Sequence, residues 1–326
     1  MSPDAFRFWV LGNHYLFQLD DESYNKALRA FRSAIESEPE FAEAYAGFAQ
    51  GHAYQAAWVG SDSAASVLPL AHEAADKALS LDPGLAVAHY TLGIVRYYSW
   101  DWEGAESAFR NGQRLSRSVS GFPAGSTGEV EFANFLTAMG RSAEAIEMAG
   151  KAVGIDPHSP VPLNELGWAL MFDGQAEAAL EMYERAFTLG VDDAQTNALL
   201  AMIYISTGQA DKANPYMESI VASAASQSPT IQASVGLLLG MAGRDLDARG
   251  VLNNLNTLAK TEHVPAIAFA YLYLGLGDLE ETLDCLEAAY AERDTSLVWL
   301  KTHPWYDPLR DHPRFKNIVD RMAFPD

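Results

Sequence analysis

A spacing of about 34 residues recurs along the chain and limits how it can fold more than any other feature. The pattern Gly-x4-Ala-x3-aromatic-x2-Ala begins at Gly174, and its small and bulky positions recur one repeat later, beginning at Gly208. Small residues let two antiparallel helices approach closely, and a glycine ends the first helix of the pair. Because one helix pair cannot bury its apolar face alone, the repeat predicts stacked pairs in an all-α array. An ordinary helical bundle would not keep this spacing.

The same frame extends over the chain and gives about eight units. Asp82-Pro83 and Asp156-Pro157 stop the second helix of their units, since proline cannot continue a helix. The first helix is expected over residues 6–19. Other units are marked by small residues at equivalent positions: Ala27 and Ala34, Ala71 and Ala78, Gly93 and Ala105, Ala145 and Ala152, Gly236 and Ala248, and Gly277.

These positions resemble the tetratricopeptide repeat. The resemblance implies a right-handed superhelical α-solenoid of about eight helix pairs with a C-terminal capping helix. We expect the array over residues 1–306 and the cap over residues 307–326. Extra residues near 57–69 and 116–128 predict longer loops, which either lie on the surface or fold over the groove. In the expected cap, one helical stripe holds Phe315, Ile318, Val319 and Met322.

Two further segments resemble one group of bacterial proteins more specifically. One is Tyr98-Ser99-Trp100-Asp101-Trp102, followed by Ala105-Glu106 and Phe109; the other is the closing run from Leu286 through Trp299, His303-Pro304 and Asp307-Pro308 to Phe315. Both are similar to the repeat region that follows an adenylate or guanylate cyclase, a Ser/Thr kinase or a winged-helix domain in bacterial signalling proteins. The sequence starts directly with the array, as an excised region or a stand-alone member would. No catalytic or DNA-reading residue can therefore be transferred.

The chain is strongly acidic. Its 22 Lys and Arg against 43 Asp and Glu give a formal net charge of −21. This field repels phosphate backbones and anionic lipid headgroups, so we predict no direct nucleic-acid or membrane partner, and it attracts basic partners. With one cysteine, no intrachain disulfide forms. The start lacks the pattern of a signal peptide, and we expect a cytoplasmic protein.

The first helix of each pair lines the concave face in such repeats, and four of its positions recur at helical spacing there. We predict an aromatic and apolar groove with a few amides, suited to a protein or peptide ligand of basic or apolar character. Exposed aromatics at Tyr90, Tyr97 and Trp168 would mark the contact patch, although any of these side chains could instead pack between helices. The predicted partner-binding residues are Tyr90, Ile94, Tyr97, Asn134, Asn164, Trp168, Met171, Gln195, Met202 and Tyr271.

The sequence offers no constellation for catalysis. It has no HExxH spacing and no nucleotide-binding glycine motif, so we predict no enzyme activity, no cofactor and no metal. A cluster of His303, Asp307, Asp311 and His312 is better explained by turns, because Pro304, Pro308 and Pro313 interrupt it. Cys285 is expected to be an inert thiol on a buried helix face.

Together these features predict an interaction module of a bacterial signalling or transcriptional regulator that holds a protein or peptide on its concave face. Two alternatives stay open. A superhelix of this kind can enclose a small molecule, or it can dimerise a larger cyclase-type protein.

Overall fold

The computed structural model describes residues 2–16, 21–59, 64–116, 125–189, 194–224 and 228–325. Its described residues form helices and no strand, which confirms the all-α prediction. The chain divides into two compact units, Met1–Phe132 and Ala133–Asp326, with the division inside α7. We call them unit 1 and unit 2 and describe each by itself.

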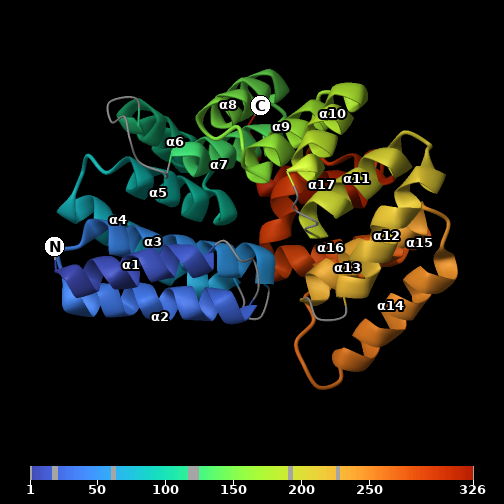
Figure 1. Ribbon diagram of the computed structural model, residues 1–326. Coiled ribbons are helices and arrows are strands. Elements are labelled where there is room, and N and C mark those ends of the chain that lie inside the picture. Colours follow the sequence, from blue (N-terminus) through green and yellow to red (C-terminus); the bar gives the residue numbers. More distant parts are fainter. Residues whose placement is uncertain are drawn as a thin grey trace. The chain divides into compact units, whose positions relative to one another are not determined.

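Unit 1 is a stack of three helix pairs followed by the first part of α7 (Figure 1). Within each pair the two helices pack against one another, and α3 also packs against α5. The helices are α1 (Pro3–Leu16), α2 (Asp21–Ser37), α3 (Ala42–Tyr54), the π-helix η1 (Gln55–Val59), α4 (Ala64–Leu81), α5 (Ala86–Tyr98), α6 (Trp102–Ser116) and α7 (Gly125–Ala138).

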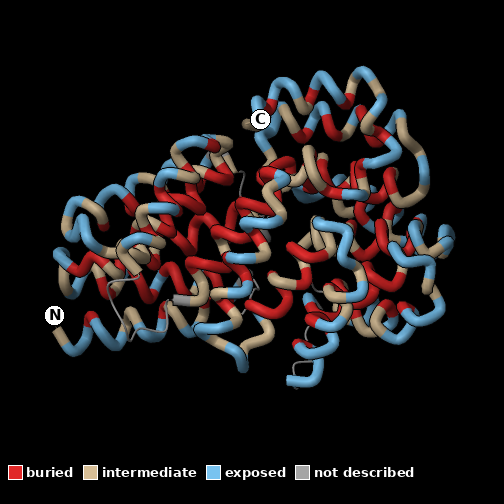
Figure 2. The backbone as a smooth tube through the Cα atoms, turned by 90° about the horizontal axis from the view of Figure 1, so that it is seen from above, coloured by how far each residue is buried: buried red, intermediate tan, exposed pale blue. Residues whose placement is uncertain are grey.

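Unit 2 continues the same order, and α9, α11, α13 and α15 each pack on the next of these helices. Its remaining helices are α8 (Ser142–Ile155), α9 (Pro160–Phe172), α10 (Ala176–Thr188), α11 (Ala194–Ser206), α12 (Ala210–Ala224), α13 (Pro229–Met241), α14 (Asp245–Leu258), α15 (Ala266–Leu276) and α16 (Leu279–Glu292). Two 3-10 helices, η2 (Thr295–Trp299) and η3 (Pro304–Leu309), lead to α17 (Pro313–Met322). In both units each helix turns a buried face inward, so buried and exposed residues alternate along the chain (Figure 2).

The turn between the two helices of a pair has a fixed backbone conformation. In five successive pairs a glycine stands there with φ between 72° and 78°: Gly140, Gly174, Gly208, Gly243 and Gly277. Glycine adopts this left-handed conformation without steric cost, which explains why the sequence repeats it. In the pair α5–α6 the same turn holds Trp100, with φ 65°. A tryptophan in this region is strained, and it belongs to the Trp100-Asp101-Trp102 motif.

Glycines also allow helices of neighbouring pairs to touch. A Cβ atom on Gly240 of α13 would lie 2.3 Å from the carbonyl oxygen of Gly275 in α15. In the reverse direction, a Cβ on Gly275 would lie 2.8 Å from the backbone of Leu237. The backbones of α13 and α15 are therefore in direct contact, as the predicted role of small residues requires.

The expected helix over residues 6–19 corresponds to α1, while residues 17–20 lie outside the described part. The expected loop at 57–69 is largely wrong, because η1 extends α3 to Val59 and α4 begins at Ala64. Only residues 60–63 of that stretch lie outside the described part. Around the other expected loop, α6 ends at Ser116 and α7 starts at Gly125, while residues 117–124 are not described.

Helix α17 packs on α16 through the stripe expected from the sequence. Phe315, Ile318 and Met322 are buried. Arg314 donates to three carboxylates of one face of α16: Glu287 at 2.9 Å, Glu280 at 3.2 Å and Asp284 at 2.6 Å. Residues at these spacings share one helix face, so a single guanidinium bridges the whole row.

Candidate binding site

The three predicted groove residues of unit 1 lie in the core. Tyr90 is 4% exposed, Ile94 1% and Tyr97 0%. The Tyr90 hydroxyl donates to Oε1 of Glu129 at 2.8 Å, and its ring lies against Gly112. The expected exposed aromatic patch is therefore not formed by Tyr90 and Tyr97, because neighbouring helices close over both rings.

The predicted residues of unit 2 differ in exposure. Asn164 is buried, and its amide donates to Oγ1 of Thr196 at 2.9 Å, so one of its donors is used inside the fold. Met202 and Tyr271 are buried as well. Gln195 is exposed, whereas intermediate exposure is shared by Asn134, Trp168 and Met171.

The chain's own C-terminal segment, residues 295–309, contacts these helices in unit 2. Trp168 lies 5.5 Å from Trp299, centroid to centroid, with the rings at 83°. Phe172, one turn further along α9, lies 5.2 Å from the ring of His303. Such edge-to-face pairs add about 0.5–1.5 kcal/mol each beyond burial. Both aromatic side chains of α9 are thus partnered within the chain.

The same segment reaches α15. Tyr271 and Trp305 are 5.7 Å apart at 78°, and Trp305 lies 4.0 Å from the ring of His303. The C-terminal segment therefore spans from α9 to α15. Sequence reasoning placed aromatic side chains on this face, and the structure shows that residues 295–309 cover part of it.

His303 is at the centre of this contact and is 3% exposed. Burial, and secondarily the charge of Arg310, lower its pKa to about 3, so the imidazole is neutral. Its Nδ1 accepts a hydrogen bond from the backbone N–H of Trp305 at 3.2 Å. Arg310 also holds the turn, because it donates to the carbonyl oxygens of Lys301 at 2.7 Å and His303 at 3.0 Å.

Asp307, Asp311 and His312, which lie near His303 in the sequence, each have a partner within the fold. Asp307 binds the Arg310 guanidinium at 2.7 Å, and Asp311 pairs with Lys316 at 3.2 Å. Nδ1 of His312 accepts from the Arg314 N–H at 3.3 Å. Among the residues described, no group of three or more His, Cys, Asp or Glu is placed to hold a metal ion.

Cys285 is half-buried, so the expected full burial is wrong. Burial, with nearby Asp284 adding to it, raises the pKa of its thiol to about 11. The thiol is therefore protonated and a weak nucleophile. In the described part of the chain, no helix is long and apolar enough to cross a membrane.

A polar site that the sequence analysis missed lies in unit 1, where α3, α5 and α7 meet. The Tyr54 hydroxyl donates to Oε1 of Glu131 at 2.5 Å, and the Gln50 amide donates to the Tyr54 oxygen at 3.0 Å. Gln50 and Tyr54 are buried, while Glu131 is half-buried. We call these three residues the Glu131 site, together with Tyr98 at the end of α5, which interacts electrostatically with Tyr54.

Desolvation raises the pKa of Glu131 to about 7, and the bond from Tyr54 only partly offsets it. Within the described residues, no Lys, Arg or His forms an ion pair with this carboxylate. A half-buried carboxylate without a cation is costly, because burial penalises its charged form. A positive charge placed beside Glu131 would therefore stabilise its ionised form.

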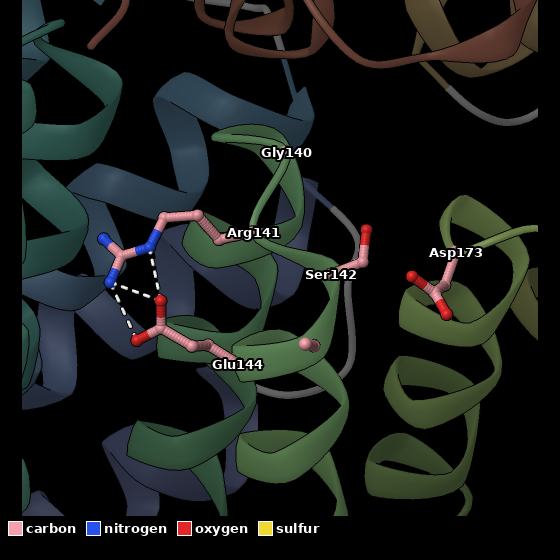
Figure 3. A pocket seen from close by; sticks show the side chains of 6 residues that line it. Gly140, Arg141, Ser142, Glu144 and Asp173 are labelled. Carbon is pink, nitrogen blue, oxygen red and sulfur yellow. Dashed lines mark hydrogen bonds and ion pairs between the residues drawn. The ribbon is translucent and has the colours of Figure 1, made fainter. Parts of the chain in front are cut away.

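A small open hollow of about 290 Å³ lies at the start of α8 in unit 2 (Figure 3). Its charged side chains belong to Arg141, Glu144 and Asp173. Arg141 turns toward Glu144 and donates to both of its carboxylate oxygens, at 2.7 and 2.8 Å. The guanidinium is thus already paired, and the hollow offers no convergent set of groups for a ligand.

Comparison with known proteins identifies the fold. No family model and no curated protein matches the sequence. Solved structures that are similar include Cut9 in the APC/C Cut9–Hcn1 hetero-tetramer, with a TM-score of 0.62, 16% identity, and coverage of 95% of this chain and 54% of that chain. Human IFIT1 in a dimer with m7Gppp-AAAA has a TM-score of 0.60 and 16% identity over 98% of this chain and 72% of that chain. The type IV pilus biogenesis factor PilW has a TM-score of 0.50 and 18% identity over 68% and 94%. The chain has a tetratricopeptide-type fold.

Proposed function

We propose that this chain is a protein-interaction scaffold that binds a basic peptide segment at the Glu131 site of unit 1. One observation carries the proposal: a half-buried carboxylate is held by a tyrosine and has no cationic partner among the described residues. A lysine or arginine side chain supplies the missing charge and forms charge-assisted hydrogen bonds to Glu131. The net charge of −21 favours the approach of such a partner.

In unit 2, only some of the predicted groove residues are placed to contact a protein or peptide partner. Trp168 and Tyr271 contact the C-terminal segment, so a partner would have to displace that segment to use both side chains. Asn134, Met171 and Gln195 keep some exposed surface and stay proposed contacts. Tyr90, Ile94, Tyr97, Asn164 and Met202 serve packing first, because they are buried.

The proposed cellular role rests on the sequence resemblance to bacterial signalling proteins. The segment around Trp100-Asp101-Trp102 and the closing run favour an interaction module of a bacterial signalling or transcriptional regulator in the cytoplasm. The similar folds of Cut9 and IFIT1 were solved with ligands as different as Hcn1 and m7Gppp-AAAA, so fold similarity does not select a partner class. The excess of acidic residues disfavours nucleic acid.

The Glu131 site predicts a charge-dependent and pH-dependent affinity. Extended synthetic peptides of equal length with no, two or four lysines should bind in order of their lysine content at pH 8. Glu131→Gln should weaken the tetralysine peptide about tenfold, because the buried ion pair is lost. With a pKa of about 7, the ionised fraction of Glu131 falls about tenfold from pH 8 to pH 6, and wild-type affinity should fall by a similar factor.

The matched control is Glu103→Gln, which removes an exposed carboxylate of the same unit. It should leave the affinity within about twofold, since exposed pairs contribute little. Equal affinity of wild type and Glu131→Gln at pH 8, measured by isothermal titration calorimetry, would contradict the proposal. A small molecule that raises the melting temperature of wild type but not of Glu131→Gln would favour the sensor alternative.

A further inference from the structure

Unit 2 carries a row of exposed apolar side chains that follows the helix-pair repeat. Ile155 is 53% exposed, and Leu189, at the equivalent position of the next pair, is 38% exposed. Phe187 and Val221 are also one repeat apart, and each is 39% exposed. They lie at or near the C-terminal ends of α8, α10 and α12, the second helices of three consecutive pairs. With Tyr216 of α12, we call them the apolar ridge.

The ridge is continuous between two of these pairs. The rings of Phe187 and Tyr216 are 5.9 Å apart at 87°, a direct contact from α10 to α12. Tyr216 in turn stacks on Tyr204 at 6.0 Å. Exposed apolar residues scattered singly are ordinary, but a row that is joined by contacts and recurs with the repeat marks an interaction surface.

The repeat itself does not require this exposure. Counted from the turn glycines Gly208 and Gly243, the position equivalent to Val221 in the next pair is Asn256, a polar residue. The outer face of α14 is polar instead, with Asn253, Asn254 and Asn256 exposed. Helix α14 thus shows that a second helix of this fold forms its core contacts without an apolar outer face.

Acidic side chains flank the ridge at the same period. Glu184 and Glu218 precede Phe187 and Val221 by three residues, so each shares a helix face with its apolar neighbour, and both are exposed. The Tyr204 hydroxyl donates to Glu184 at 3.3 Å, which orients that carboxylate beside the ridge. Glu177 and Glu181 add two more exposed carboxylates on α10.

Few of the nearby cations are available to balance them. Lys151 donates to Glu147 at 2.6 Å, and Lys212 lies 5.8 Å above the ring of Tyr204. Arg185 is exposed on α10. A second copy of this chain would bring the same acidic surface and be repelled, whereas a partner with basic flanks would be attracted.

We propose that the apolar ridge docks a basic amphipathic helix of a partner protein, with its apolar stripe on the ridge and lysines or arginines beside Glu184 and Glu218. Neighbouring second helices lie about 8–10 Å apart, so three of them span about 20 Å. A helix rises about 1.5 Å per residue, and about 14 residues cover that length. This surface is separate from the Glu131 site and does not depend on it.

The probe is a synthetic Leu/Lys helix of about 18 residues, long enough to fold and to cross the ridge. Wild-type protein should bind it at moderate salt, as measured by fluorescence anisotropy. The double variant Phe187→Ser, Val221→Ser should bind at least tenfold more weakly. A peptide of the same composition, scrambled so that no apolar stripe forms, should bind wild type as weakly as the double variant binds the helix.

Two matched variants complete the test. Leu246→Ser removes the most exposed leucine, at 87%, away from the ridge, and should leave binding unchanged. Glu131→Gln should also leave it unchanged, so the two proposals fail separately. Equal binding by wild type and the double variant would overturn the docking site, as would a wild-type dimer in sedimentation that the double variant abolishes.

Discussion

Gly240→Ala is expected to destabilise unit 2 by about 3 kcal/mol, a large effect for one added methyl group. The new Cβ would lie 2.3 Å from the carbonyl oxygen and 2.5 Å from the carbonyl carbon of Gly275. The atoms in the way are backbone, so no side chain can rotate aside. The helices α13 and α15 must separate, which opens the packing on both sides. Urea denaturation followed by far-UV circular dichroism measures the loss.

Gly150→Ala is the control for this prediction. Gly150 also lies inside a helix, α8, and a Cβ there would meet nothing within 4 Å. Alanine should stabilise this position by about 0.5–1 kcal/mol, because glycine has the lower helix propensity. If the two variants shifted the unfolding midpoint alike, the close contact of α13 and α15 would be refuted.

The sequence predicted the fold because its strongest signals are local. Gly174, Gly208 and Gly277 mark turns with positive φ, and such a conformation restricts the choice of residue directly. The apolar stripe of α17 was predicted for the same reason, since Phe315 and Ile318 share one helix face.

The exposure of the groove residues could not be predicted from the sequence, because it depends on contacts between residues far apart in the chain. The period identifies the side of a helix that Trp168 occupies, but not that Trp299 from the chain's end packs against it. Tyr90 and Tyr97 fit an exposed aromatic patch equally well until their neighbours are placed. Glu131 was missed because a glutamate on a helix is usually solvated, and only α3 supplies the tyrosine that changes its environment.

The chain departs from the repeat at Trp100 and at the insertion that follows α3, and the sequence alone misled the prediction at both places. Trp100 occupies the turn position where later units have glycine, a substitution that sequence reasoning treated as a family motif and not as a backbone constraint. Residues 57–69 were expected to form a loop, yet the first three of them continue the helix as part of η1. The composition of η1, Gln-Ala-Ala-Trp-Val, is compatible with a helix, so the length of the insertion was the misleading signal.

His303 should make the stability of unit 2 fall as the pH is lowered from 6.5 to 3. Its pKa is about 3 in the folded protein, against 6.5 for an ordinary histidine. Above pH 6.5 neither state binds the proton, and the group contributes nothing to the pH dependence. Below it, the unfolded chain gains a proton that the folded state does not bind, at about 1.4 kcal/mol per pH unit. The loss should reach about 2 kcal/mol at pH 5.

His303→Asn tests this prediction, because asparagine is a favoured cap that can accept the Trp305 N–H without titrating. The variant loses ring contacts and is less stable at pH 8, so the decisive quantity is the change in unfolding free energy between pH 7 and pH 5. Carboxylates titrate in both proteins, and their contribution cancels in the comparison. His312→Asn is the matched control for the loss of a histidine cap, since His312 also accepts a backbone N–H at the start of a helix, α17, but is only half-buried. If His303→Asn kept the wild-type pH dependence, the prediction that the neutral imidazole packed against Trp168 and Trp305 causes it would be wrong.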